Sequence, residues 1–80
     1  MDVSAVRAKI ANGSLPRTDW DWTRLGIGAP DRACSICSRP TSPADMAVEC
    51  CRAGLIFTLH PDCYVLWEEA REIERQKGTN

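Results

Sequence analysis

Four side chains in this sequence are of the types that bind a metal ion, and they occur as two closely spaced pairs. Cys34 and Cys37 enclose two residues in the run CSIC, and His60 and Cys63 enclose two residues in the run HPDC. The first pair can form a tight turn that directs both sulfurs to one point, and residues three apart at the start of a helix share a face. Four nitrogen and sulfur ligands suit tetrahedral zinc. The sequence therefore predicts one structural zinc ion with no ligand position left for water.

The length of the chain favours this interpretation. Eighty residues form at most one small domain, and a core of that size is marginal without disulfides, a metal or a partner. The five cysteines are an odd number, which disfavours a framework made of disulfides alone. Structural zinc contributes on the order of 10–16 kcal/mol of apparent binding free energy at neutral pH. That contribution exceeds the whole stability expected of such a domain.

The first residues of the chain are informative about the cellular compartment of the protein. The run MDVSAVRAKIANG has no continuous apolar core of the kind found in signal peptides. No run approaches the ~20 apolar residues that span a bilayer, so we expect a cytoplasmic protein without a membrane partner. Paired cysteines in that compartment are metal ligands or redox groups more often than disulfides. A redox motif at Cys34 and Cys37 is the alternative, although the βαβ context of a thioredoxin-like motif is not visible.

Two further cysteines, Cys50 and Cys51, are neighbours in an apolar run. Neighbouring residues on a strand point to opposite faces, so both cannot easily bind the same ion. The simplest interpretation is that one of them is a small buried apolar side chain. Two alternatives stay open: one of them replaces His60 as a ligand, or an exposed one senses redox state with a pKa lowered by Arg52.

Residues 1–33 are expected to hold a short helix followed by an irregular segment. Apolar residues at helical spacing predict the helix over about residues 3–11. Residues 14–33 lack a sustained period, so we expect an irregular segment pinned by its aromatic side chains. Gly26 and Gly28 within it are interpreted as flexible loop positions and not as part of a dinucleotide-binding motif, because no strand precedes them and no helix follows.

Residues 34–80 are expected to form the zinc-binding module, and the two parts together one compact domain. The runs MAVECC (46–51) and LIFTL (55–59) predict two strands joined by a short loop, which is a β-hairpin signal. From Pro61 onward the pattern is helical, because proline suits the first helical position. One apolar stripe follows, at Cys63, Leu66, Trp67, Ala70 and Ile73.

The ligand spacing C-x2-C-x22-H-x2-C resembles the first zinc module of a LIM domain. More generally it is similar to treble-clef zinc fingers, in which a knuckle, a hairpin and a helix start supply the ligands. The run HPDCYVLWEEAR, preceded by Leu15-Pro16, Trp22 and two glycines, also resembles small uncharacterised bacterial zinc-binding proteins. The resemblance implies a small α+β domain stabilised by zinc and treble-clef-like in form, with a short N-terminal helix added. It also implies one structural zinc held by Cys34, Cys37, His60 and Cys63.

Charge and composition narrow the function. The net charge is −1 at pH 7, and no basic arm of the kind that drives non-specific nucleic-acid binding is present. The one histidine is assigned to the metal and no acid–base pair remains, so we expect neither an enzyme nor a small-molecule substrate. We therefore expect a small regulatory or protein-interaction module with another protein as its partner. The alternative is a nucleic-acid-binding zinc finger, a transcriptional regulator, with its basic side chains gathered on one face (Arg7, Lys9, Arg17, Arg24, Arg32, Arg39 and Arg52).

Four side chains are candidates for the partner surface. Trp20 and Trp22 alternate around Asp21, so one of the two rings can be exposed. Tyr64 and Val65 lie off the apolar stripe of the C-terminal helix, and they either pack under the N-terminal segment or contact a partner. The simpler interpretation is that the aromatic rings fill a small core. Exposed aromatic anchors are frequent binding hot spots, and on that ground we assign all four to the partner surface.

Overall fold

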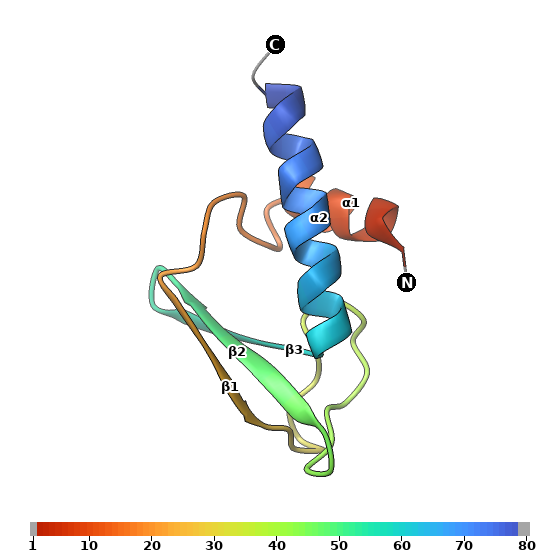
Figure 1. Ribbon diagram of the computed structural model, residues 1–80, viewed down its shortest axis with the longest axis vertical. Coiled ribbons are helices and arrows are strands. Elements are labelled where there is room, and N and C mark those ends of the chain that lie inside the picture. The colour runs from red at the N-terminus through yellow and green to blue at the C-terminus, as the bar shows by residue number, and fades with distance from the viewer. Residues whose placement is uncertain (1, 79–80) are drawn as a thin grey trace.

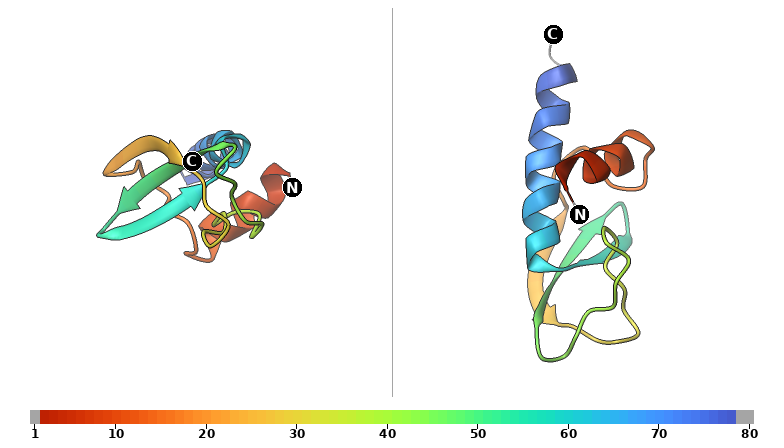
Figure 2. Two further views of the ribbon diagram at one scale, coloured as in Figure 1. Left: turned by 90° about the horizontal axis from the view of Figure 1, so that it is seen from below. Right: turned by 90° about the vertical axis from the view of Figure 1, so that its right-hand side faces the viewer.

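The computed structural model describes residues 2–78 and has two helices and one three-stranded antiparallel sheet (Figure 1). The elements follow in the order α1 (Val3–Ala11), β1 (Trp22–Ile27), β2 (Met46–Arg52), β3 (Leu55–Leu59) and α2 (Pro61–Gly78). Strand β2 is central, with β1 and β3 on its two sides. Helix α2 begins over the sheet and extends beyond it, and α1 packs against α2 (Figure 2). Within residues 2–78, no helix has both the length and the apolar content to cross a membrane.

Helix α1 coincides with the helix predicted from the sequence. The Asp2 carboxylate accepts a hydrogen bond from the Ala5 backbone N–H (3.1 Å), which satisfies one of the donors that a helix start leaves unpaired. Val6 and Ile10 are buried, and one turn of a helix separates them. A helix of this length is unstable alone in water, so its buried face against α2 keeps it in place.

The hairpin of β2 and β3 also matches its prediction. Arg52 pairs with Leu55 across the ladder, so the turn consists of Ala53 and Gly54. Both residues have positive φ values, 54° and 81°, as a type I′ turn requires. Gly54 adopts this conformation freely, whereas Ala53 does so at a steric cost.

The expectation of an irregular segment between the first helix and the knuckle is wrong for Trp22–Ile27. These residues form β1, which pairs antiparallel with β2 so that Leu25 lies opposite Val48. Every residue of β1 except Gly26 is exposed, so no alternation between buried and exposed positions marks the strand in the sequence. Pairing with a strand much later in the chain decides its conformation, and local pattern does not reveal such pairing.

The interpretation of Gly26 as a flexible loop position is also wrong because Gly26 lies within β1, whereas Gly28 lies in the loop that follows the strand and is buried there. A Cβ atom on Gly26 would lie 2.8 Å from Glu49 Oε1, and one on Gly28 would overlap the backbone of Ser42. Gly28 also donates its N–H to the Asp45 carbonyl oxygen (3.2 Å). Gly28 is therefore a site where the backbone of another segment lies too close for a side chain, whereas at Gly26 only the flexible Glu49 carboxylate would have to move.

Helix α2 carries the buried stripe that its sequence predicts. The His60 carbonyl accepts the N–H of Tyr64 (2.9 Å), so the helix begins at Pro61 as expected. Cys63, Trp67 and Ala70 are buried, and the other two members of the stripe, Leu66 and Ile73, are partly buried. The core that this stripe joins also contains Val6, Ile10, Leu15, Cys34, Ile36, Val48, Cys50 and Leu59.

A cluster of aromatic rings fastens the segment after α1 to the core. The Trp20 ring lies 4.9 Å from the Trp67 ring and 5.1 Å from the Phe57 ring, between centroids. Trp67 Nε1 donates a hydrogen bond to the Pro16 carbonyl oxygen (3.1 Å). These contacts connect the irregular residues before β1 to α2 and β3.

Candidate metal centre

A tight turn presents the first two candidate ligands. The Cys34 N–H donates to the Arg39 carbonyl oxygen, and the Cys34 carbonyl oxygen accepts the Ser38 N–H, both at 2.9 Å. Ser38 has a φ of 66°, a left-handed conformation that reverses the chain after Cys37. The Ile36 N–H points at the Cys34 sulfur (3.4 Å), so a backbone donor supports negative charge on that atom.

The second pair stands where β3 ends and α2 begins. His60 directly follows β3, and Cys63 lies in the first turn of α2. The hairpin returns the chain to the knuckle, and the Ser35 N–H donates to the Thr58 carbonyl oxygen of β3 (2.9 Å). This bond fixes the position of the knuckle relative to the end of β3.

The four predicted ligands meet at one point. One ligand atom of each of Cys34, Cys37, His60 and Cys63 lies within 4.8 Å of every other. His60 Nδ1 is 3.3 Å from Cys37 Sγ and 4.0 Å from Cys63 Sγ. Sulfur and nitrogen bound to one tetrahedral zinc ion, at bond lengths of ~2.3 and ~2.0 Å, are about 3.6 Å apart. The four residues therefore lie close enough to bind one metal ion.

The imidazole of His60 is oriented as a metal ligand requires. Its Nε2 lies 3.3 Å from the Pro40 carbonyl oxygen, which can only accept a hydrogen bond. The tautomer with its proton on Nε2 donates to this carbonyl and directs the lone pair of Nδ1 at the sulfurs. A hydrogen bond from the second ring nitrogen to a carbonyl is the usual support of a histidine ligand.

The thiols of the cluster compete for negative charge. Burial raises the pKa of Cys37, but hydrogen bonds from the Arg39 backbone and from Cys34 outweigh burial and lower the pKa to about 6. Burial, together with the nearby sulfur of Cys34, raises the pKa of Cys63 to about 12. Three thiolates this close together are unfavourable without a cation among them, and coordination to a metal ion deprotonates thiols. The donor set therefore fits a divalent metal ion.

Cys50 and Cys51 lie outside this cluster. Cys50 is completely buried in the core, and burial raises its pKa to about 12. A redox-sensing thiol needs a lowered pKa and access to solvent, and Cys50 has neither. Cys51 is 9% exposed, and its neighbours on the adjacent strands are Trp22 and Ile56. His60, and neither of these two cysteines, provides the fourth side chain of the cluster.

The four candidate partner residues do not form one surface. Trp22 is 42% exposed and lies on the sheet face opposite α2, whereas Val65 is 51% exposed and lies on α2. Trp20 and Tyr64 are partly buried and pack against the core. Only Trp22 and Val65 thus offer large exposed areas, and they do so on different sides of the molecule.

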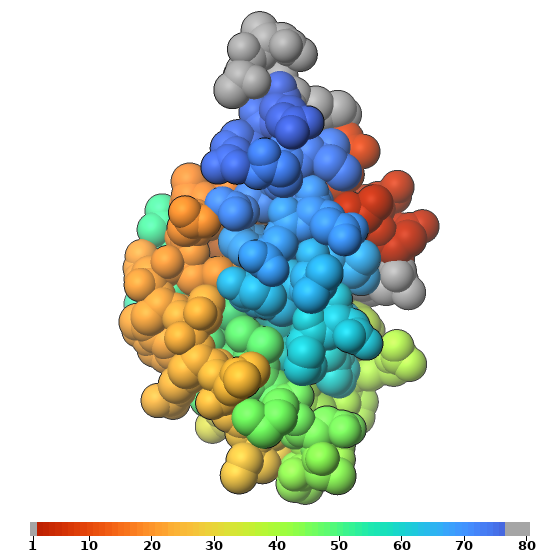
Figure 3. Space-filling view, in the orientation of Figure 1, coloured from red at the N-terminus to blue at the C-terminus, as the bar shows by residue number. Residues whose placement is uncertain are grey.

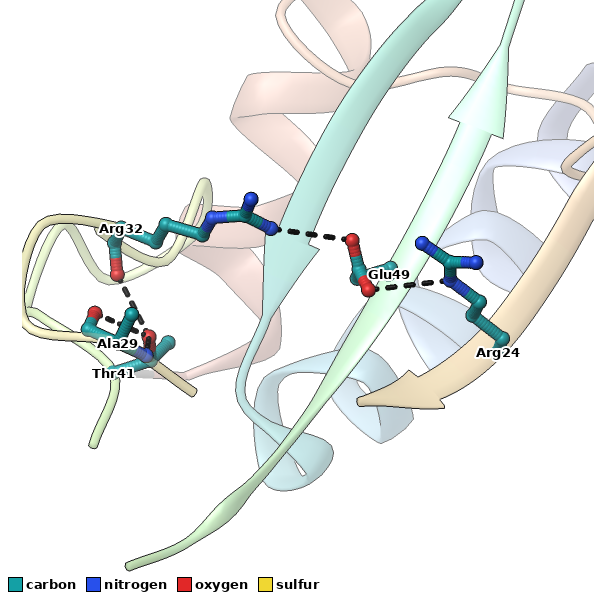
Figure 4. Close-up of polar contacts among 5 residues, drawn as sticks. All are labelled: Arg24, Ala29, Arg32, Thr41 and Glu49. Carbon is teal, nitrogen blue, oxygen red and sulfur yellow. Dashed lines mark hydrogen bonds and ion pairs between the residues drawn. The ribbon is translucent and has the colours of Figure 1, made fainter. Parts of the chain in front are cut away.

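Sequence analysis missed Glu49, which connects β1, β2 and the segment before the knuckle. Its carboxylate accepts hydrogen bonds from Arg24 Nε (3.2 Å) and Arg32 Nη1 (3.3 Å) (Figure 4). Only 15% of the Glu49 side chain is exposed, so the arginines shield it from water. The available signal was a single charged residue inside the apolar run MAVECC.

Thr41 was also missed, and it holds together the loop that carries the knuckle. Its side chain is buried, and its hydroxyl accepts the Ala29 N–H (2.9 Å) (Figure 4). The same hydroxyl lies 2.8 and 2.9 Å from the carbonyl oxygens of Ala29 and Arg32 and donates its proton to one of them. A threonine between a serine and a proline in a polar loop gives no sequence signal for this role.

Comparison with known proteins adds no family name to this arrangement. No family model, curated protein or solved structure matches the chain. The described residues form a small α+β fold with a three-stranded antiparallel sheet, two helices and a cluster of three cysteines and one histidine.

Proposed function

We propose that this chain is a zinc-stabilised protein-interaction module with a regulatory role and no catalysis of its own. In this proposal Cys34, Cys37, His60 and Cys63 hold one structural Zn²⁺ in a treble-clef-like arrangement of knuckle, hairpin and helix start. Three sulfurs and one imidazole nitrogen favour zinc over harder cations. Four protein ligands leave no position for a substrate or a reactive water, which argues against metal-based catalysis.

The observation that carries the interaction proposal is the sheet face opposite α2, which we call the open face. Trp22 and Ile56 are 42% and 53% exposed there, on either side of Cys51. The Arg24 guanidinium lies over the Trp22 ring, 5.3 Å from its centroid. Tryptophan and arginine dominate binding hot spots between proteins, and a stacked pair on a rigid sheet loses little conformational entropy on binding.

The pairing of the arginines argues against the nucleic-acid alternative. Arg24 and Arg32 both bind Glu49, and Arg52 binds Asp21 (3.0 Å). A nucleic-acid finger needs unneutralised basic side chains to replace counterions on phosphates. With the net charge of −1, the arginines on the open face are suited to local contacts with a protein more than to long-range attraction of a polyanion.

A binding comparison tests this proposal. The metal-loaded full chain is immobilised, nuclease-treated lysate is passed over it, and captured proteins are identified for wild type, Trp22→Ala and Leu55→Ala. Leu55 is the matched control, because it is 63% exposed and lies on the other face of the sheet. A specific partner should be retained by wild type and Leu55→Ala and lost by Trp22→Ala, with the fold of all three unchanged by circular dichroism.

Duplex and single-stranded oligonucleotides form the other arm of this experiment. Fluorescence anisotropy should show negligible affinity at ~0.15 M salt, since the field of the molecule is weak. Tight binding that falls steeply with salt and weakens in Arg24→Ala and Arg32→Ala, with no protein captured through Trp22, would establish the nucleic-acid function instead.

A further inference from the structure

One edge of the sheet has backbone groups without a strand to pair with. Within residues 2–78, β1 has a neighbour on one side only. Gly28 donates to Asp45 across the ladder, and hydrogen-bonded pairs alternate along antiparallel strands. The even-numbered residues of β1 therefore bond to β2, and Thr23, Leu25 and Ile27 direct their N–H and C=O groups outward.

Beside this edge lies a group of exposed apolar side chains, which we call the β1 patch. It comprises Leu25, Ile27, Met46 and Val65, which are 66%, 74%, 49% and 51% exposed. Ile27 and Met46 face each other across the ladder, and Leu25 and Val65 line one shallow hollow between β1 and α2. Figure 3 shows β1, in orange, along the margin of the molecule beside the first turns of α2, in cyan and blue.

The β1 edge lacks the sequence features by which natural proteins prevent edge strands of different molecules from pairing. Natural edge strands are protected by lysines, prolines, bulges within the strand or a covering loop. The run WTRLGI has one charged residue, Arg24, which shares the Glu49 carboxylate with Arg32. An edge of this composition is a template for another strand.

We infer that the β1 edge binds the same edge of a second copy of this chain, so that two sheets join into one continuous antiparallel sheet. The twofold axis passes beside Leu25. Leu25 then pairs with Leu25 of the partner subunit, and Thr23 pairs with Ile27 of the partner subunit. All the outward backbone groups are then used, in about six hydrogen bonds. The β1 patches of the two copies meet on one face of the joined sheet.

The other face of the joined sheet accommodates the same register. Arg24 lies opposite Gly26 of the partner subunit, and Trp22 lies opposite Gly28 of the partner subunit. No like charges face each other directly, an arrangement that would be destabilising. The Glu49 carboxylate fills the space above Gly26 and the Ser42 backbone fills the space above Gly28, so Arg24 lies beside the opposite charge of Glu49 of the partner subunit. Strand β1 therefore pairs well with an antiparallel copy of itself, and this favours a second copy of the chain over an unrelated peptide.

The available area suits a small dimer. The four side chains of the β1 patch are about half to three-quarters exposed, and an apolar patch of a few hundred Å² on a monomer is often functional. The backbone edge, Thr23 and part of Trp22 raise the area that a second copy covers toward the ~800 Å² per partner of a standard interface. A net charge of −1 adds little repulsion between copies.

The test is sedimentation velocity of the metal-loaded full chain over micromolar to submillimolar concentrations. Wild type should reach twice the mass of the 8.9 kDa chain. Leu25→Lys places two like charges opposite each other, and Thr23→Pro removes an outward N–H at a position where an edge strand tolerates proline. Each should raise the dissociation constant at least about tenfold. Ile56→Lys, on the open face, should leave the constant unchanged.

The register has its own readout. In mixed dimers of isotope-labelled and unlabelled chains, NMR should detect close contacts between Thr23 and Ile27 of the partner subunit. Wild type sedimenting at the mass of one chain at every concentration would overturn the inference. So would a dimer that both β1 variants leave intact while circular dichroism shows them folded. A monomer that still captures a protein through Trp22 would overturn this inference alone and leave the proposed function standing.

Discussion

Single side chains around the metal centre differ sharply in what their loss should cost. We predict that Cys37→Ser leaves well under half an equivalent of bound zinc, because a serine hydroxyl does not replace a thiolate ligand. Cys51→Ser should keep one zinc per chain and lose about 1 kcal/mol of unfolding free energy, the cost of burying a hydroxyl. Metal analysis of both purified variants decides this. Loss of zinc from Cys51→Ser would mean that the ligand set is wrong.

The contribution of Thr41 to stability could not be predicted from the sequence. Thr41→Val keeps the shape of the side chain but leaves the partly buried Ala29 N–H without its acceptor, and a carbonyl loses its donor as well. We predict a loss of about 1–3 kcal/mol of unfolding free energy, the usual cost of a buried unsatisfied polar group. Thr18→Val, at an exposed position, is the control and should change stability by less than about 0.5 kcal/mol. Equal denaturation midpoints for the two variants would contradict the role assigned to the hydroxyl.

At the scale of elements, the register of α2 is open to direct test. Leu66 packs against the core, whereas Glu72 forms an ion pair with Arg75 at the surface. Leu66→Asp should destabilise the fold by several kcal/mol and leave little folded protein, since it places a charge on the buried face. Glu72→Lys should stay within about 0.5 kcal/mol of wild type. Thermal melts that tolerate both changes equally would refute the register.

The hairpin turn offers a stabilising change. Ala53 has a φ of 54°, a conformation that asparagine adopts more readily than alanine. Ala53→Asn keeps the N–H that Ala53 donates to the Asp21 carboxylate (2.9 Å). We predict a gain of about 0.5–1 kcal/mol in unfolding free energy. A lower midpoint in urea denaturation would show that the turn differs from this description.

How far each element could be predicted depends on where its contacts lie. The boundaries of α1, β3 and the start of α2 follow from local pattern, because caps, proline and apolar period act within a few residues. Strand β1 could not be predicted, since its side chains are exposed and its pairing is long-range. The same holds for the bonds of Glu49 to two arginines, which join segments far apart in the chain. The ligand pairs were predictable because their chemistry is carried by residue type and spacing alone.

At the scale of the whole molecule, the candidate metal centre lies where three segments of the chain meet. The knuckle, the end of β3 and the first turn of α2 meet at the cluster of Cys34, Cys37, His60 and Cys63. The core around it is small, and Trp67 and Ile36 are among its largest fully buried side chains. A domain of this size has a marginal free energy of unfolding. A metal ion that binds the folded state and not the unfolded state is therefore expected to supply much of that stability.

The central claim is that one metal ion at this cluster maintains the fold, and one experiment addresses it directly. Metal content per chain is determined for the purified protein, and unfolding is followed by circular dichroism before and after chelation. The account predicts one zinc per chain, a cooperative transition in the loaded protein and loss of that transition on chelation, with recovery when zinc is restored. Well under half an equivalent of metal in protein that still unfolds cooperatively, with no change on chelation, would contradict it.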